Sequence, residues 1–171
     1  MGDRIFIIGG WNRSSCLNTV YEADLKSKHL IPKQPMLCSK CLHSLCHLDS
    51  FIYSIGGNGN PGYLNDCEKY DIIGNKWSAL PGLNTPRNGS AVFTWNHGLF
   101  AFCGCNGAYL NSMEQLSLLS CAKWDVVTVT NPPPGRWGVH GISINSGILV
   151  FGGYDGDEYI INIVLRMSAI C

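Results

Sequence analysis

The chain is poor in charge, and the few charges that it carries cancel. Charged residues make up only 14% of the 171 residues, with 12 basic and 12 acidic side chains. A chain without an excess of Lys and Arg lacks the electrostatic attraction that draws proteins to nucleic acid or to an acidic membrane surface. We therefore expect neither nucleic acid nor a membrane among its partners.

Long hydrophobic runs and helical periodicity are also missing. No apolar stretch approaches the roughly 18 residues that a membrane-spanning helix requires, and no window keeps apolar residues at helical spacing long enough to predict a helix. The chain instead combines 46% hydrophobic residues with 20 glycines, in many short apolar runs. This composition is typical of a sheet protein whose strands are buried on both faces.

The N-terminal residues do not have the pattern of a secretory signal peptide. They enter the apolar segment at Ile5 without the longer hydrophobic stretch that such a peptide needs. A cytoplasmic location is therefore expected, and the nine cysteines are predicted to be reduced thiols. Cys46, Cys103 and Cys121 lie in or beside apolar segments, where a free thiol behaves as a small hydrophobe.

The chain does contain an internal repeat. Four apolar segments each end in a pair rich in glycine, namely Gly9-Gly10, Gly56-Gly57, Gly104-Cys105 and Gly152-Gly153. The first members of these pairs are 47, 48 and 48 residues apart (56 − 9, 104 − 56 and 152 − 104). Other residues recur at a similar interval, namely Trp77 with Trp124, Lys40 with Arg87 and Arg136, and Asp24 with Asp71 and Ser117. A period of this size predicts a repeat architecture.

Turn-forming clusters of Gly, Pro and Asn divide each repeat into short strands. We predict strands at about 42–48, 51–55, 66–71 and 76–80 in the second unit, and at about 89–95, 99–103, 112–117 and 123–129 in the third. The first unit opens with a strand at 4–8, and the last closes after a strand at about 159–165. A unit of four strands is the composition of a propeller blade.

The second unit resembles the kelch repeat, since it carries Gly56, Gly57, Leu64, Asn65, Tyr70, Asp71, Trp77, Pro86 and Arg87. The other units depart from this pattern at Cys105, Ala23, Leu116 and Leu30, which stand in place of Gly, Tyr, Tyr and Trp. The resemblance covers the whole chain and implies an all-β, kelch-type β-propeller. We predict one domain over 1–171, with units at about 1–48, 49–96, 97–145 and a partial unit at 146–171.

About four blades of four-stranded antiparallel sheet would form a partial or open arc. Such an arc would belong to a longer protein, close by an unusual route or pair with another chain, because unpaired propeller edges invite association. The residues expected to maintain the repeat are Gly9, Gly10, Gly56, Gly57, Tyr70, Asp71, Trp77, Arg87, Gly104, Trp124, Arg136, Gly152 and Gly153. Arg87 and Arg136 have the fork geometry to hold loop carbonyls or a carboxylate, and Lys40 would do this less well.

The sequence supports a catalytic or metal-binding site less well than a recognition surface. Cys41, His43 and His47 would share one face of the strand predicted from Leu42, but the next unit has Asn88, Ser90 and Thr94 there, so we expect no metal site. On paper His140 pairs with Arg136 and Cys103 with Asp125, without a supporting motif. The carboxylates Glu68, Asp71 and Glu114 fall on outer strands. We therefore expect no catalytic residue and no cofactor.

By resemblance to kelch domains, the residues that follow the double Gly and the Arg line one end of the propeller and form the recognition surface, unless they are simply turn residues. These are Trp11, Asn12, Arg13, Asn58, Asn88, Asn106, Trp137, Tyr154 and Asp155. The resemblance implies a non-catalytic protein–protein interaction module, such as the substrate-recognition part of a ubiquitin-ligase adaptor or a cytoskeleton-binding protein. The alternatives are a propeller enzyme similar to galactose oxidase or to a sialic-acid isomerase, and a gene fragment without independent function.

Overall fold

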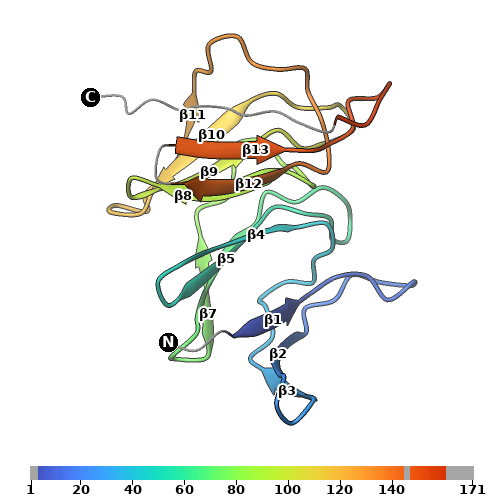
Figure 1. Ribbon diagram of the computed structural model, residues 1–171, viewed down its shortest axis with the longest axis vertical. Helices are drawn as coiled ribbons and strands as arrows, with labels where there is room; N and C mark the ends of the chain where they lie inside the picture. The colour runs from blue at the N-terminus through green and yellow to red at the C-terminus, as the bar shows by residue number, and fades with distance from the viewer. Residues whose placement is uncertain (1–3, 145–146, 161–171) are drawn as a thin grey trace.

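The computed structural model describes residues 4–144 and 147–160, and this part of the chain is built from thirteen β-strands without a helix. The strands form four antiparallel sheets, which we call blades 1 to 4 in chain order. In Figure 1 blade 1 lies at the bottom and blade 2 above it, and blades 3 and 4 lie together in the upper part. No helix in these ranges is long and apolar enough to cross a membrane.

Blade 1 has three described strands, and blade 2 has four. Blade 1 contains β1 (Ile5–Ile8), β2 (Val20–Asp24) and β3 (His29–Lys33), in that order across the sheet. Blade 2 contains β4 (Ser44–Leu48), β5 (Phe51–Ile55), β6 (Cys67–Asp71) and β7 (Lys76–Leu80). Within each blade every strand pairs antiparallel with the next one along the chain.

Blade 3 repeats the four strands, and blade 4 is described as a pair. Blade 3 contains β8 (Ala91–Trp95), β9 (Gly98–Phe102), β10 (Met113–Ser117) and β11 (Trp124–Val127). Blade 4 contains β12 (His140–Ile144) and β13 (Gly147–Phe151). The predicted strands at 51–55 and 76–80 match β5 and β7, and β1, β4, β6 and β8 to β11 differ from their predicted ranges by one or two residues at an end. Most of the strand predicted at 159–165 lies outside the described residues.

The blades are arranged radially, as in a propeller. The first strands of blades 2, 3 and 4 converge, because β8 contacts both β4 and β12. In blade 1 the corresponding position inside β1 holds no strand within the described ranges, where β1 pairs only with β2. The described chain is therefore an open arc of antiparallel propeller-type blades, in agreement with the predicted all-β propeller.

Three hydrophobic clusters hold neighbouring blades together. Ile8 and Val20 of blade 1 pack with Ile52, Tyr70 and Trp77 of blade 2. A second cluster joins blades 2 and 3, and a third joins blades 3 and 4. Because side chains alternate across a strand, each inner blade presents one apolar row to the blade before it and another to the blade after it.

The glycine corner of the third unit lies one residue earlier than predicted. Cys103 has a φ of 61°, like Gly9 and Gly56 at 58° and 59°, and Gly104 at 100° corresponds to Gly10 and Gly57 at 103° and 106°. The corner is therefore Cys103-Gly104, and the predicted pair Gly104-Cys105 is wrong. A Cβ on Gly56 would lie 2.3 Å from the Arg87 carbonyl oxygen, which explains why this corner usually needs glycine.

The prediction that all cysteines are reduced is wrong for one pair. Cys16 and Cys41 form a disulfide with a Cα–Cα distance of 5.1 Å. The backbone bridge between Leu17 and Lys40 brings these two loops together, although the cysteines are 25 residues apart in sequence. Cys67 and Cys103 are free and fully buried, as expected of thiols that act as small hydrophobes.

Candidate interaction face

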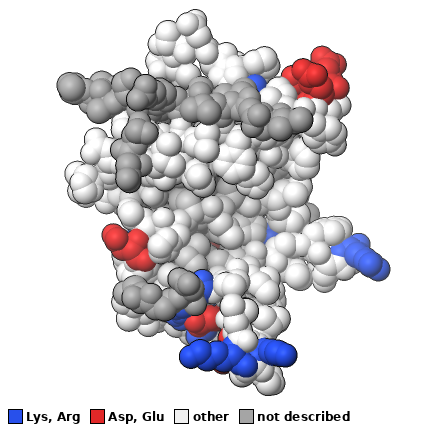
Figure 2. Space-filling model, viewed as in Figure 1, with Lys and Arg blue, Asp and Glu red and all other residues white. Residues whose placement is uncertain are grey.

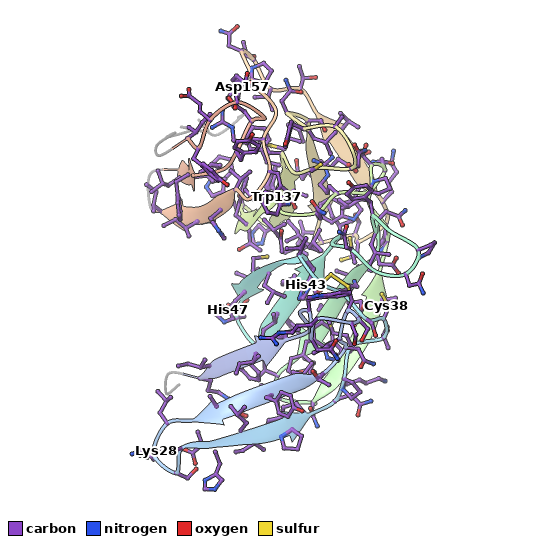
Figure 3. All side chains as sticks on the ribbon, turned by 90° about the vertical axis from the view of Figure 1, so that its right-hand side faces the viewer. Lys28, Cys38, His43, His47, Trp137 and Asp157 are labelled. Carbon is purple, nitrogen blue, oxygen red and sulfur yellow. A yellow bond between two sulfur atoms is a disulfide. The ribbon has the colours of Figure 1, made fainter. Side chains whose placement is uncertain are left out.

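The loops that follow the glycine corners lie along one side of the arc, one in each blade. In each blade the loop is closed by a single backbone bridge, and these bridges are Trp11–Cys16, Asn58–Tyr63, Cys105–Tyr109 and Tyr154–Tyr159. In blades 2, 3 and 4 the same loops also pair with the segment that enters the blade, through Cys41–Asn58, Asn88–Cys105 and Trp137–Tyr154. Figure 3 views the molecule from this side, with Trp137 and His43 near its centre. We call this surface the loop face.

Five of the nine predicted recognition residues take part in this network of bridges, namely Trp11, Asn58, Asn88, Trp137 and Tyr154. The amide of Asn88 donates to Oδ1 of Asn58 at 2.9 Å, which joins two neighbouring loops. The predicted Asn106 lies one residue beyond Cys105, the residue that occupies the position equivalent to Asn58. The one-residue error at the corner carried through to this assignment.

The other predicted residues stabilise their own turns. Oδ1 of Asn12 accepts from the backbone N–H groups of Ser14 and Ser15, and Oδ1 of Asp155 accepts from those of Asp157 and Glu158. These hydrogen bonds hold the pKa of the Asp155 carboxyl below its usual value. Asn12 and Asp155 therefore have a turn-forming role. Arg13 is exposed and has a φ of 80° in the same turn as Asn12.

Sequence reasoning missed a column of tyrosines on the loop face. Tyr63, Tyr109 and Tyr159 occupy equivalent bridge positions in blades 2, 3 and 4, and Cys16 stands there in blade 1. Their spacings of 46 and 50 residues (109 − 63 and 159 − 109) were the available signal. They are 44%, 42% and 80% exposed, and Trp11 in blade 1 is 58% exposed. Exposed aromatic side chains on a rigid scaffold are suited to protein recognition.

Three tyrosines form a contiguous aromatic cluster across blades 3 and 4. The ring of Tyr154 meets that of Tyr109 edge-on at 5.9 Å between centroids, and that of Tyr159 at 5.0 Å. The hydroxyl of Tyr154 donates to the Gly156 carbonyl, which fixes the central ring. The cluster therefore presents a large apolar area at little cost in conformational entropy.

Charge is separated along the loop face. The blade 4 loop carries Asp155, Asp157 and Glu158, seen as a red group at the upper right of Figure 2. Figure 3 labels Asp157 at the same end of the molecule. Arg13 lies in the loop of blade 1, at the other end of the arc. A partner that spans the face would meet an acidic, tyrosine-rich end at blades 3 and 4 and a basic end at blade 1.

Buried ion pairs lie beneath the loop face in blades 2 and 3. Arg87 is fully buried and donates to Glu114 at 2.7 Å, to the carbonyls of Cys103 and Ser112 at 2.9 and 3.0 Å, and to the Ser112 hydroxyl at 3.2 Å. Lys40 donates only to Glu68 at 3.0 Å and to the Asp66 carbonyl at 3.2 Å. The prediction that Lys40 would anchor its loop less well is consistent with these fewer contacts.

The carboxylates complete the anchor by binding the connection between blades. Glu68 accepts from the backbone N–H groups of Leu37 and Cys38, and Glu114 accepts from those of Asn84 and Thr85. The connections that carry the loop-face residues are thus held by fully desolvated, hydrogen-bonded charges. Glu68 and Glu114 are therefore structural residues.

Arg136 occupies the same position at the entry to blade 4. It is only 2% exposed and donates from Nε to the Pro134 carbonyl at 3.2 Å. Its Nη2 group is buried and has no hydrogen-bond partner among the described residues. By alignment of the repeats, Val164 is the residue that corresponds to Glu68 and Glu114. Val164 lies outside the described residues, and in sequence it puts an apolar side chain where the second and third units have a carboxylate.

The predicted sharing of one strand face by Cys41, His43 and His47 is wrong. Leu42 has a φ of 53°, so the extended backbone is interrupted there and β4 begins only at Ser44. Cys41 is bonded to Cys16, and the ring of His47 makes its hydrogen bond to the Asp49 carbonyl. In the described ranges no three His, Cys, Asp or Glu side chains are placed to hold a metal ion.

The groups considered for catalysis are engaged elsewhere. Burial raises the pKa of the Cys103 thiol to about 11, so it stays protonated and a weak nucleophile at neutral pH. Asp125, which was considered as its catalytic partner, is exposed and pairs with Lys123. Asp71 accepts from the N–H groups of Ile73 and Gly74 in a tight turn.

His43 makes the stability of this region dependent on pH. Its imidazole lies beside Gly9 and Met36 with neither ring nitrogen hydrogen-bonded, and burial, with Lys40 nearby, lowers its pKa to about 4. Below pH 6.5 His43 becomes protonated in the unfolded chain, whereas in the folded chain it becomes protonated only near pH 4. The free energy of unfolding is therefore expected to fall by roughly 3 kcal/mol as the pH is lowered across that window.

Urea unfolding of the His43→Ser variant between pH 7.5 and 4.5 measures this contribution. Serine is the residue at the equivalent position of the next unit, Ser90. In this variant we expect the free energy of unfolding to depend less steeply on pH above pH 4.5. In His47→Ser, whose ring is exposed, we expect the same dependence as in the wild type. Glu22 acts in a separate window, because Arg4 and Lys33 lower its pKa from 4.5 to about 2. An unchanged slope in His43→Ser would contradict the assignment.

Comparison with known proteins gives the kelch-repeat family along most of the chain. The model of the KLHDC2/KLHL20/DRC7 Kelch-repeats domain matches residues 1–153. Kelch-like protein 25 of Xenopus tropicalis is 26% identical over 160 residues, which cover 89% of this chain and 27% of the frog protein.

Two further relatives match over shorter stretches. Kelch repeat and BTB domain-containing protein 2 of cowpox virus (strain GRI-90 / Grishak) is 33% identical over 82 residues, covering 47% of this chain and 15% of the viral protein. Alpha-scruin of Limulus polyphemus is 30% identical over 96 residues, covering 52% of this chain and 10% of that protein. The chain thus spans a minor part of the length of each relative.

Proposed function

Because this chain belongs to the kelch-repeat family, we propose that it is a non-catalytic protein-interaction module whose partner binds the loop face. The observation that carries the proposal is the row of exposed aromatic residues held at equivalent bridge positions of successive blades. Aromatic side chains dominate the binding energy of many protein interfaces. In blades 2 and 3 the loops that present them are anchored at their bases by buried ion pairs, so little ordering of these loops is needed on binding.

Two more specific cellular roles fit a module of this kind, and we propose that the loop face binds the partner in either role. One is the substrate-recognition part of a ubiquitin-ligase adaptor, and the other is a cytoskeleton-binding protein. Both place the module in the cytoplasm. The position of the loop face is the same in both, so the test below addresses the face before it addresses the role.

Truncation of the aromatic cluster tests the proposal. Tyr109→Ala and Tyr159→Ala each remove an exposed ring without touching the buried anchors. The partner is captured by cross-linking from source cells and then purified. We expect either change to raise its dissociation constant by about 30-fold, as for a hot-spot residue. Isothermal titration calorimetry measures the constant.

The matched control is Ile73→Ala, which removes a 75% exposed side chain from the turn between β6 and β7 at the opposite end of the blades. It should leave the dissociation constant unchanged. Equal affinity of the wild type and both tyrosine variants would reject the loop face as the binding site.

A further inference from the structure

The two ends of the arc expose apolar rows that are buried between blades everywhere else in the described chain. In blade 2 the cross-strand row Ile52, Tyr70 and Trp77 faces blade 1, and its members are 7%, 0% and 3% exposed. In blade 3 the equivalent row is Leu99, Leu116 and Trp124, with 0%, 0% and 2% exposed. Each row packs against the blade that precedes it.

Blade 1 has the same row, but its surface is open. The row is Ile5, Ala23 and Leu30, in which Ile5 is 46% and Leu30 is 53% exposed. Ile7 lies two residues further along β1 on the same face and is 47% exposed. We call this surface the blade 1 end face.

Blade 4 exposes the row that, in blade 3, packs against the blade that follows it. Phe102 of blade 3 is fully buried against blade 4, together with its cross-strand neighbour Ala91. The equivalent residue of blade 4 is Phe151, which is 37% exposed. Ile142 and Ile144 lie on the same face of β12 and are 48% and 44% exposed. We call this surface the blade 4 end face.

We propose that the blade 4 end face of one copy packs on the blade 1 end face of a second copy of this chain. The two faces are the two halves of the blade-to-blade interface that the chain already forms three times. They lie at opposite ends of the arc, so one copy cannot join them to each other (Figure 1). Contact between unlike faces is heterologous, and repetition closes a ring or extends a chain.

The sizes of the facing side chains favour this pairing. Blade 1 has Ala23 and Leu30 where blade 2 has the larger Tyr70 and Trp77. Blade 4 has Phe151 where blades 1 and 2 have Ile8 and Ile55. A larger side chain opposite smaller ones keeps the interface filled. The rows named here carry no Lys, Arg, Asp or Glu that would be desolvated without a partner, and the ionisable neighbour on the blade 4 end face is the exposed His140, which pairs across the strands with Phe151.

Analytical ultracentrifugation of the purified chain and two end-face variants tests the proposal. Leu30→Asp puts a charge on the blade 1 end face, and Ile142→Asp puts one on the blade 4 end face. The wild type is expected to sediment above the monomer mass of 18.7 kDa at micromolar concentration. Each variant alone should be monomeric, with association weakened at least about 30-fold. Circular dichroism confirms that both remain folded.

An equimolar mixture of the two variants gives the decisive result. Each variant keeps the face that the other has lost, so the mixture should form a dimer and nothing larger. Leu119→Asp, at an 82% exposed residue in the turn after β10, should associate like the wild type. A monomeric wild type at about 100 μM, far above the dissociation constant of a specific interface, overturns the proposal. Self-association retained by either end-face variant, or a mixture that stays monomeric, overturns it too.

Discussion

Replacing Arg87 with alanine is expected to lower the free energy of unfolding by about 3–5 kcal/mol, because it leaves the buried carboxylate of Glu114 without its counter-charge. Both side chains are at most 1% exposed, and their nitrogen and oxygen lie 2.7 Å apart. The substitution also removes the donors to the carbonyls of Cys103 and Ser112, which lie on either side of the blade 3 loop. Urea unfolding followed by tryptophan fluorescence measures the change.

An exposed ion pair of similar length is the matched control. Lys123 and Asp125 approach to 2.9 Å, but their side chains are 77% and 65% exposed. Solvent screens such a pair, so Lys123→Ala is expected to cost less than about 1 kcal/mol. The Arg87→Lys variant should fall between these results, because a lysine satisfies fewer acceptors, as Lys40 does in blade 2. If Arg87→Ala cost no more than Lys123→Ala, the buried anchor would not hold the loops.

Removal of the Trp124 side chain is the second large effect. Trp124→Ala is expected to lower the free energy of unfolding by about 3–5 kcal/mol, the usual cost of deleting a large buried aromatic ring. Trp124 is 2% exposed and lies in the core between blades 2 and 3, close to Leu99 and Leu116. Its Nε1 also donates to the Pro81 carbonyl at 2.8 Å, on the connection that leaves blade 2.

Two companion variants separate the contributions of Trp124. Trp124→Phe keeps much of the ring but loses the hydrogen bond to Pro81, and we expect a loss of about 1 kcal/mol beyond the effect of the smaller ring. Trp11→Ala removes a tryptophan that is 58% exposed on the loop face and should cost less than about 1 kcal/mol. Equal losses in Trp11→Ala and Trp124→Ala would show that Trp124 does not join the blades.

The loop face was recognised from sequence only in part. Trp11, Asn58 and Trp137 were found because they follow glycine or arginine in the repeat. The tyrosines were missed because Tyr63, Tyr109 and Tyr159 follow the corners at slightly unequal distances, so no strict period marks them. Cys105 was misplaced because sequence alone could not decide between Cys103 and Cys105 as the substitute for a corner glycine.

The sequence by itself determined the repeat, the strands and the kelch-type blades, because apolar alternation and glycine turns are local patterns copied along the chain. Only the tertiary structure decided which residues form the corners, which loops share a face, and which apolar rows are left open at the ends of the arc. The third corner is defined by a hydrogen bond from the Gly104 N–H to the Arg136 carbonyl, across 32 residues of sequence (136 − 104). Contacts of that range depend on how the blades pack, and no local pattern of residues specifies them.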